Sequence, residues 1–249
     1  MASLGTPLLR FDSVPSTNDL ARQMAIEGAA EGTAILALHQ TAGRGRQGKH
    51  WASPPGQGLY VSVVLRPCIK PAALPILTLG AAVAVADTLI GTLGLAPDIK
   101  WPNDVMAGGR KVCGILIESG IESGRTLYAV LGVGLNVSQR EFPEELRGIA
   151  TSLAIESGVP ATPDEVLPAL LERLEYWYRI SLSAPARVLE RWTSLSSYAM
   201  DCRVRIVSSE EVFEGVTRGI TPAGYLIVEG ADGRRREFAT GEVSLRKQD

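Results

Sequence analysis

The 249-residue chain carries 25 Lys and Arg residues against 27 Asp and Glu residues, which gives a formal net charge of −2. This balance excludes a global positive field for nucleic acid, so any basic patch must be local. The length allows one large domain and one small domain, and the 45% hydrophobic fraction is typical of a soluble globular protein. Three scattered cysteines form no disulfide framework, and two histidines are too few for a histidine-rich metal site. Because the N-terminus also lacks a signal-peptide pattern, we expect a cytoplasmic protein.

Apolar periodicity predicts alternating strands and helices along the first 200 residues. The first strand begins near Leu8, and Thr17, Asn18 and Asp19 offer caps for a helix that follows. The pattern predicts helices at 17–29, 74–93, 163–182 and 185–195 and strands at 34–39, 59–66, 98–101, 112–119 and 127–137.

Residues 74–95 are long and apolar enough to raise the question of a membrane span. Asp87 lies inside this segment, and Ala, Gly and Thr dominate it, so a buried helix against a sheet is favoured. From Cys202 onward, short strands separated by turns predict a small barrel or sandwich.

The most informative segment is residues 43–51, Gly-Arg-Gly-Arg-Gln-Gly-Lys-His-Trp, called the basic loop below. Its three glycines let the backbone bend closely around a ligand, because a residue without a Cβ adopts positive φ at little cost. Three cations lie between and beside them, and there is too little apolar surface for self-packing. We expect a loop that is mobile until an anion binds, as suits a phosphorylated ligand.

Two common motifs match the basic loop by accident. Gly43, Gly45 and Gly48 spell G-x-G-x-x-G, but a Pro- and Gly-rich stretch follows instead of a helix, and no acidic residue lies between the loop and Asp87. The same residues spell G-x-x-x-x-G-K, but His50 stands where a triphosphatase loop needs Ser or Thr. Neither a dinucleotide fold nor a phosphate-loop triphosphatase follows.

Four further segments each admit a structural or a functional interpretation. Residues 15–18 (Pro-Ser-Thr-Asn) suit a helix cap or a ligand contact, and residues 100–104 (Lys-Trp-Pro-Asn-Asp) suit a turn or a site. Lys111 begins a strand, where a charge is usually solvated, although Gly114 within that strand allows close approach of a ligand. Asn136 ends a glycine-containing apolar strand at residues 132–137, where a buried amide needs a partner.

Taken together, these segments resemble the biotin–protein ligases, with Gly-Arg-Gly-Arg and Lys-Trp-Pro-Asn-Asp as the most specific elements. The resemblance covers about residues 10–140, and residues 241–246 look like the end of the family's small C-terminal barrel, while 140–200 match in helical character only. A lipoate or octanoate ligase, which shares the catalytic fold, is the nearest alternative. A module that binds single-stranded nucleic acid through the basic loop and Trp51 is disfavoured by the net acidity.

The resemblance implies an α+β fold: a class II aminoacyl-tRNA synthetase-like mixed sheet with flanking helices at residues 1–199, then an SH3-like β-barrel at 200–249. It also implies a two-step reaction in which biotin and MgATP give biotinyl-5′-adenylate and pyrophosphate, and a carrier-protein lysine then takes the biotin. The partner is the biotin carboxyl carrier domain of a carboxylase, and a homodimer through sheet edges occurs in such families. We expect no DNA binding, because no helix-turn-helix fits before the first strand, and no membrane association.

Family matching also suggests roles for individual residues. Lys111 and Arg46 are the expected catalytic cations, because a carboxylate and a phosphate repel each other. Asp104 is a possible ligand of the Mg²⁺ that accompanies ATP. The expected biotin contacts are Ser16, Thr17, Asn18, Gln40, Gly43, Arg44, Gly45, Arg46, Lys111 and Gly114. The expected ATP or adenylate contacts are Arg46, Lys49, Trp51, Asn103, Asp104, Lys111 and Asn136.

Overall fold

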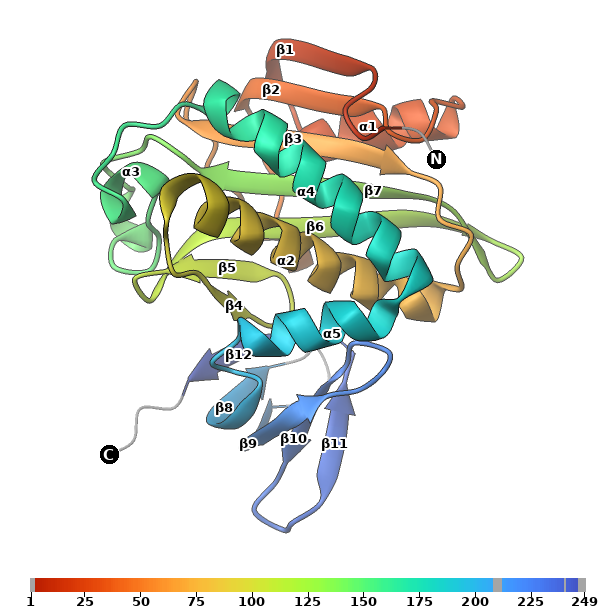
Figure 1. The fold of residues 1–249 in the computed structure, drawn as a ribbon, viewed down its shortest axis with the longest axis vertical. Coiled ribbons are helices and arrows are strands. Elements are labelled where there is room, and N and C mark those ends of the chain that lie inside the picture. The colour runs from red at the N-terminus through yellow and green to blue at the C-terminus, as the bar shows by residue number, and fades with distance from the viewer. Residues whose placement is uncertain (1–2, 208–211, 240, 246–249) are drawn as a thin grey trace.

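The computed structural model describes residues 3–207, 212–239 and 241–245, and its centre is a seven-stranded mixed sheet (Figure 1). The strand order is β1-β2-β3-β7-β6-β5-β4, with β1 parallel to β2 and every other neighbouring pair antiparallel. The strands are β1 (Leu8–Val14), β2 (Ala34–Gln40), β3 (Gly58–Leu65), β4 (Asp98–Lys100), β5 (Asp104–Ala107), β6 (Arg110–Glu122) and β7 (Arg125–Asn136). The predicted mixed sheet is confirmed.

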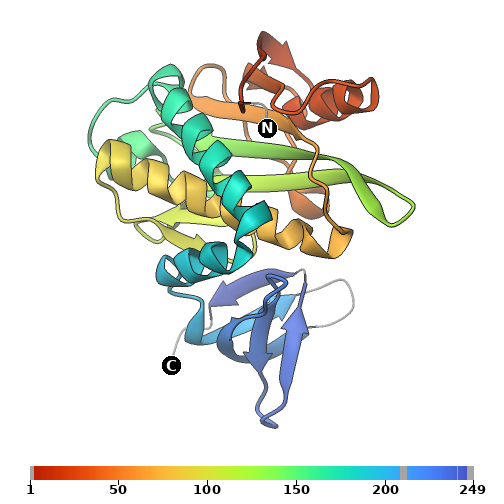
Figure 2. The same ribbon diagram turned by 45° about the vertical axis from the view of Figure 1, so that its right-hand side comes forward.

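The two faces of this sheet carry different cover. Helices α2 (Leu74–Leu93) and α4 (Pro163–Ser183) cross one face, and α5 (Pro185–Ser194) lies between them and the C-terminal sheet (Figure 1). Helix α1 (Thr17–Ile26) packs on the opposite face, against β3 and β7 (Figure 2). Because side chains alternate along a strand, Val63 joins the large core under α2 and Val64 the small core under α1.

Helix α2 is the segment that raised the question of a membrane span, and by length and composition it passes that test. However, 67% of its most apolar window is buried inside the fold, as in a core helix. Its single charge, Asp87, accepts hydrogen bonds from Trp177 Nε1 at 2.9 Å and from Arg191 Nη2 at 2.6 Å. The predicted buried helix against a sheet is therefore what the structure has.

The residues after α5 form a second, antiparallel sheet of five short strands, which confirms the predicted small SH3-like unit (Figure 2). Its strand order is β11-β10-β9-β8-β12. The strands are β8 (Met200–Val207), β9 (Val212–Ile220), β10 (Leu226–Glu229), β11 (Arg235–Phe238) and β12 (Glu242–Leu245). Arg246, the last residue of the segment that resembles the family's C-terminal end, lies outside the described residues.

Most predicted bounds lie within two or three residues of the observed ones, and the differences have local causes. Helix α1 ends at Ile26 rather than 29, because Gly28 has φ of 95° and cannot continue a helix. Helix α4 begins as predicted, with a capping box between Thr162 and Glu165. The sequence analysis missed β5, α3 (Leu153–Glu156) and three 3₁₀ turns, which are all too short for a periodic signal.

Candidate active site

Two glycines in the middle of the sheet form a flat floor on the α1 face. Gly114 in β6 pairs with Gly134 in β7, and the indole of Trp51 lies against both. A Cβ at Gly134 would be 2.6 Å from Trp51 Cε2, and one at Gly114 would be 2.9 Å from Trp51 Cζ3. Only glycine therefore permits this contact, and the ring that lies against the Gly114 backbone in this structure belongs to the protein itself.

Lys111 lies at the edge of this floor. Its Nζ is 2.6 Å from Asp104 Oδ1 and 5.3 Å from the ring centroid of Trp51. Its backbone is fixed by a bridge to the segment after β7, because Lys111 N donates to Ile149 O at 2.8 Å and Thr151 N donates to Lys111 O at 2.9 Å. The result is a cation on a rigid strand with a carboxylate and an aromatic face beside it. The alternative of a merely solvated edge charge does not describe it.

The basic loop is tied to the turn that follows β4. Arg46 Nη1 donates to Asn103 Oδ1 at 3.3 Å, while Asn103 Nδ2 donates to Ile115 O at 2.7 Å. Asn103 thus links the loop to the β6 backbone. Arg46 also lines a pocket of about 200 Å³ between this turn, the start of α2 and the C-terminal sheet, whose side is formed by Gly224 and Ala239.

A second group of predicted residues surrounds the N-terminus of α1. Ser16 caps the helix, and its Oγ accepts from Asp19 N. Thr17 donates from N and Oγ1 to Gln40 Oε1 at 2.8 and 3.1 Å. Asn18 Oδ1 accepts from Ser62 Oγ at 2.7 Å. Ser16, Thr17 and Asn18 are each at most 4% exposed. The cap interpretation is confirmed for Ser16, and the ligand-contact interpretation stays a prediction.

Arg44 departs from the expected arrangement. We expected it to face ligand anions, and in the structure its Nη2 is 2.6 Å from Glu118 Oε2 and 2.8 Å from Asp19 Oδ1. Glu118 Oε2 also accepts from Asn18 Nδ2 at 3.0 Å. The guanidinium group of Arg44 therefore forms ion pairs with Asp19 and Glu118, which are the nearest anions in this structure.

Asn136 is 5% exposed, and protein groups occupy both ends of its amide. Its Nδ2 donates to Thr151 O at 2.9 Å, and its Oδ1 accepts from Gln139 Nε2 at 3.2 Å. The expectation that a buried Asn136 needs a partner is met by the segment that pairs with the Lys111 backbone. The remaining residues of the basic loop contact one another. Gly45 N donates to Lys49 O at 2.7 Å, and a Cβ at Gly43 would be 2.5 Å from Trp51 O.

The structure thus gathers the predicted residues into two neighbouring groups joined by the basic loop. The sequence analysis assigned no role to three of the polar residues that connect these groups: Ser53, Ser62 and Glu118. Ser62 was recognisable, because it is the one serine or threonine in the apolar strand β3, and the structure buries it fully. Glu118 ends the motif that begins at Lys111, so its position was visible although its partners were not.

Two observations limit the chemistry of the site. Burial raises the pKa of the Cys113 thiol far above its ordinary value, so this neighbour of Lys111 stays protonated and is no nucleophile at neutral pH. Across the described ranges, no cluster of three His, Cys, Asp or Glu side chains is placed to hold a resident metal.

Trp51 Nε1 is a buried donor without a hydrogen-bond partner, which leaves it available to a ligand oxygen.

Comparison with known proteins identifies the family. Residues 10–136 match the biotin/lipoate A/B protein ligase family, and residues 202–246 match the biotin protein ligase C terminal domain. The bifunctional ligase/repressor BirA of Bacillus spizizenii is 36% identical over 241 residues, which cover 95% of this chain and 73% of the relative. A biotin–[acetyl-CoA-carboxylase] ligase of Mycobacterium tuberculosis is 36% identical over 239 residues, which cover 92% and 85%.

Solved structures agree with these relatives. The biotin protein ligase of Aquifex aeolicus in complex with biotin and ATP superposes with a TM-score of 0.81 at 29% identity. The match covers 97% of this chain and 99% of the Aquifex chain. The agreement therefore includes both sheets. On the strength of these matches, the chain belongs to the biotin protein ligase family.

Proposed function

We propose that this protein is an ATP-dependent biotin–protein ligase that condenses biotin with ATP to biotinyl-5′-adenylate and then transfers biotin to a carrier lysine. One observation carries the proposal: a single fixed lysine lies beside a glycine floor and under an arginine-bearing loop. Lys111 Nζ is 5.3 Å from the Trp51 ring, and Trp51 lies directly on Gly114 and Gly134. The family membership and the Aquifex aeolicus complex with biotin and ATP support the same reaction.

The first step must bring a carboxylate against the negatively charged α-phosphate. A fixed cation near both anions lowers this barrier most, because it is in place before the reaction begins. We assign this role to Lys111, with Arg46 as the second cation. The contact between Lys111 and Asp104 at 2.6 Å means that an incoming anion competes with Asp104 for the ammonium group.

The Mg²⁺ that accompanies ATP can bind Asp104 and so free the Lys111 ammonium group for the incoming anion. Mg²⁺ takes oxygen ligands, chiefly phosphates and water together with one or two carboxylates. Asp104 is a carboxylate of this kind, 23% exposed and next to Lys111. Because the described residues hold no larger acidic cluster, we treat the metal as part of the ATP substrate and Asp104 as its protein contact.

Biotin needs a mostly apolar slot with a few polar contacts for its ureido ring. We assign these contacts to Ser16, Thr17, Asn18 and Gln40, which are all buried on the α1 face. Thr17, Asn18 and Gln40 belong to one hydrogen-bonded group, and Ser16 caps the helix beside it. We place the slot beside the glycine floor, with Gly43, Gly45 and Gly114 at its border. Trp51, Lys49, Asn103 and Asn136 complete the adenylate side, and the closed loop keeps water from the mixed anhydride.

In the second step the lysine amine of the carrier attacks the carbonyl carbon of the anhydride and AMP leaves. The names of the relatives point to a carboxylase as the source of the carrier domain. We propose a catalytic domain at residues 1–199 and an SH3-like domain at 200–249. We also propose that the protein forms homodimers through sheet edges and that it is located in the cytoplasm. Absence of DNA binding and of membrane association stay predictions, which a gel shift with promoter DNA and a membrane fractionation check.

Pyrophosphate release tests the proposal directly. The protein is incubated with MgATP and either biotin, lipoate or octanoate, and pyrophosphate is measured by a coupled assay. We expect release with biotin, and transfer to a biotin carboxyl carrier domain seen as a mass increase. Release with lipoate or octanoate alone would favour the related acyl ligases, and no release with any acid would refute the proposal.

A further inference from the structure

One carboxylate on the α1 face contacts both the proposed biotin slot and the basic loop. Glu118 Oε2 accepts from the buried Asn18 at 3.0 Å and from Arg44 at 2.6 Å. The adenylation step gives this residue no role, because another negative charge near two reacting anions would repel both. Its position in the middle of β6 therefore calls for a different explanation.

The contacts of Glu118 continue as a chain of hydrogen bonds that runs through side chains and through the backbone N–H of Thr17, which donates to Gln40 Oε1 at 2.8 Å. Gln40 Nε2 donates to Ser53 Oγ at 3.0 Å, and Ser53 Oγ donates to Trp51 O at 3.2 Å. The chain therefore begins at Arg44 in the basic loop and returns to the same loop at Trp51. Between these ends it passes through Glu118, Asn18, Ser62, Thr17, Gln40 and Ser53.

We propose that Glu118 is a positioning residue that holds the basic loop closed over the sheet and couples this closure to occupancy of the biotin slot. The side of Glu118 that faces Asn18 is fixed by a residue that is 4% exposed. The side that faces Arg44 is open, since the side chains of Arg44 and Glu118 are 39% and 28% exposed. A half-exposed ion pair is weak, so this contact can open and close at ordinary temperature.

Loop closure and ligand binding are coupled because Glu118 Oε2 accepts hydrogen bonds from both Asn18 and Arg44. A ligand that bonds Asn18 or Thr17 changes the hydrogen bonding of the group that orients Glu118, and so changes how well Glu118 holds Arg44. Thermodynamic linkage then requires that loop closure strengthens ligand binding by the same factor by which ligand binding favours closure. Asp19 lies 2.8 Å from the same Arg44 atom and acts as a second, weaker anchor.

Trypsin reports on loop opening without any enzymatic activity, because the basic loop contains cleavage sites at Arg46 and Lys49. Cleavage needs an opened loop, so its rate follows the open population. Glu118→Gln keeps the shape and removes the charge that holds Arg44. In the ligand-free full-length protein we expect cleavage in residues 46–49 to rise about fivefold, which corresponds to about 1 kcal/mol.

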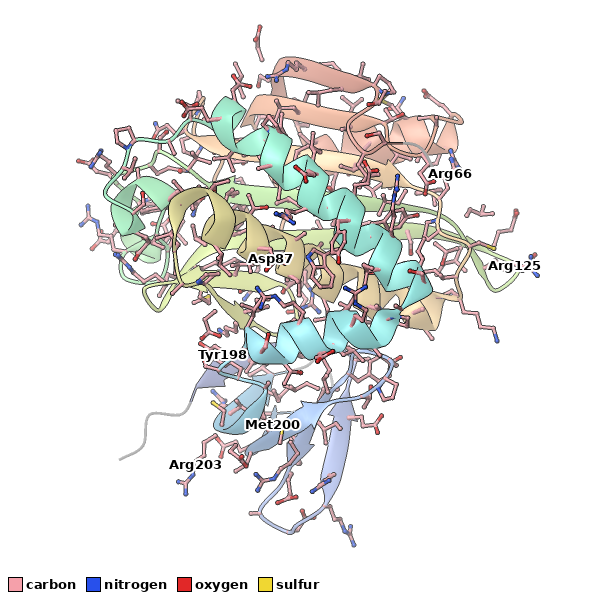
Figure 3. All side chains as sticks on the ribbon, viewed as in Figure 1. Arg66, Asp87, Arg125, Tyr198, Met200 and Arg203 are labelled. Atoms are coloured by element: carbon pink, nitrogen blue, oxygen red, sulfur yellow. The ribbon has the colours of Figure 1, made fainter. Side chains whose placement is uncertain are left out.

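Asp87→Asn is the matched control. Asp87 also joins an arginine to a neutral N–H donor, but it lies among α2, α4 and α5 on the opposite face of the sheet (Figure 3). We expect Asp87→Asn to lower thermal stability and to leave loop cleavage unchanged. If Glu118→Gln does not fold, Arg44→Gln breaks the same contact from the loop side and keeps both remaining trypsin sites.

The inference rests on the proposed function only for the identity of the ligand. With biotin as the probe, we expect KM for biotin to rise about fivefold in Glu118→Gln, with kcat nearly unchanged. The double variant Arg44→Gln/Glu118→Gln should show no more loop cleavage than the single variant that is cleaved faster. Unchanged loop cleavage in Glu118→Gln, or additive effects in the double variant, would overturn the inference and leave the ligase proposal intact. A protein that releases no pyrophosphate but shows the fivefold change in cleavage would refute the ligase proposal alone.

Discussion

The same strands of the large sheet build two faces with opposite character. Under α2 and α4, Leu131, Val133 and Leu135 of β7 join the large apolar core. On the α1 face, the alternate positions are Gly132, Gly134 and Asn136, which contact Asn18, Trp51 and Thr151. One strand therefore supplies stability from its odd-numbered residues and a floor for the site from its even-numbered ones.

This difference shows how the protein separates folding from function. The α2 face excludes water and needs only shape and volume from its side chains. The α1 face keeps polar atoms and a bare backbone where a ligand approaches, and it holds these atoms by hydrogen bonds beside the small apolar core under α1. Substitutions on the two faces should therefore change different measurements, and the following predictions use that separation.

The largest effect is expected for Lys111→Ala on the site face. Removal of a fixed electrostatic contact of this kind lowers the rate by about 10²–10³. The melting temperature should change little, because the Lys111 side chain is 31% exposed. Single-turnover formation of biotinyl-adenylate checks this, with the exposed Lys70→Ala as the control. A near-normal adenylate yield would remove Lys111 from the proposed chemistry.

Leu131→Ala tests the apolar face. Leu131 is 3% exposed, and its truncation leaves a cavity that should lower the free energy of unfolding by about 2–5 kcal/mol. Adenylation per folded molecule should stay near normal, because the side chain points away from the site. Urea unfolding and the single-turnover assay, run on the same preparation, separate the two effects. A loss of activity without a loss of stability would contradict the assignment of this face to folding.

Gly134→Ala tests the glycine floor. The added Cβ would be 2.6 Å from Trp51, so the indole must move, and overpacking of this kind costs about 1–3 kcal/mol. We expect KM for biotin to rise by about tenfold. Gly91→Ala is the control, because a Cβ there meets nothing within 4 Å and Ala favours the exposed end of α2. Equal behaviour of the two variants would argue against the floor.

The smallest effect is expected from alkaline pH. Burial raises the pKa of the Cys113 thiol above its ordinary value of 9.0 and the pKa of the Tyr60 phenol above its ordinary value of 10.0, so both groups ionise first in the unfolded chain. Their contribution to the free energy of unfolding is complete below pH 9. Above the pKa that each group has in the unfolded chain, this contribution falls by about 1.4 kcal/mol per pH unit and group. Urea unfolding at pH 8 and pH 10 checks this. Cys113→Ala should reduce the loss, and an unchanged slope in that variant would show that the thiol does not contribute.

The sequence predicts the elements well and the contacts between them poorly. Helix α2 and the capping box of α4 follow from local periodicity and local hydrogen bonds, which do not depend on the rest of the fold. The contact of Arg44 with Glu118 joins residues 74 positions apart, and no local rule indicates it. The carboxylates that reach Arg44 come from α1 and β6, and the contact of Arg44 with ligand anions stays a prediction.

The sequence by itself determined most of the longer helices and strands and the change to short strands after Cys202, because these depend on periodicity and turn residues. Its motif residues carried the resemblance to the biotin–protein ligases. Only the tertiary structure decided that Trp51 lies on the two glycines, that Lys111 faces Asp104, and that the polar residues around α1 form one chain from the basic loop back to itself. The reason is that strand register and loop closure bring distant residues together, and no single segment carries the information for either.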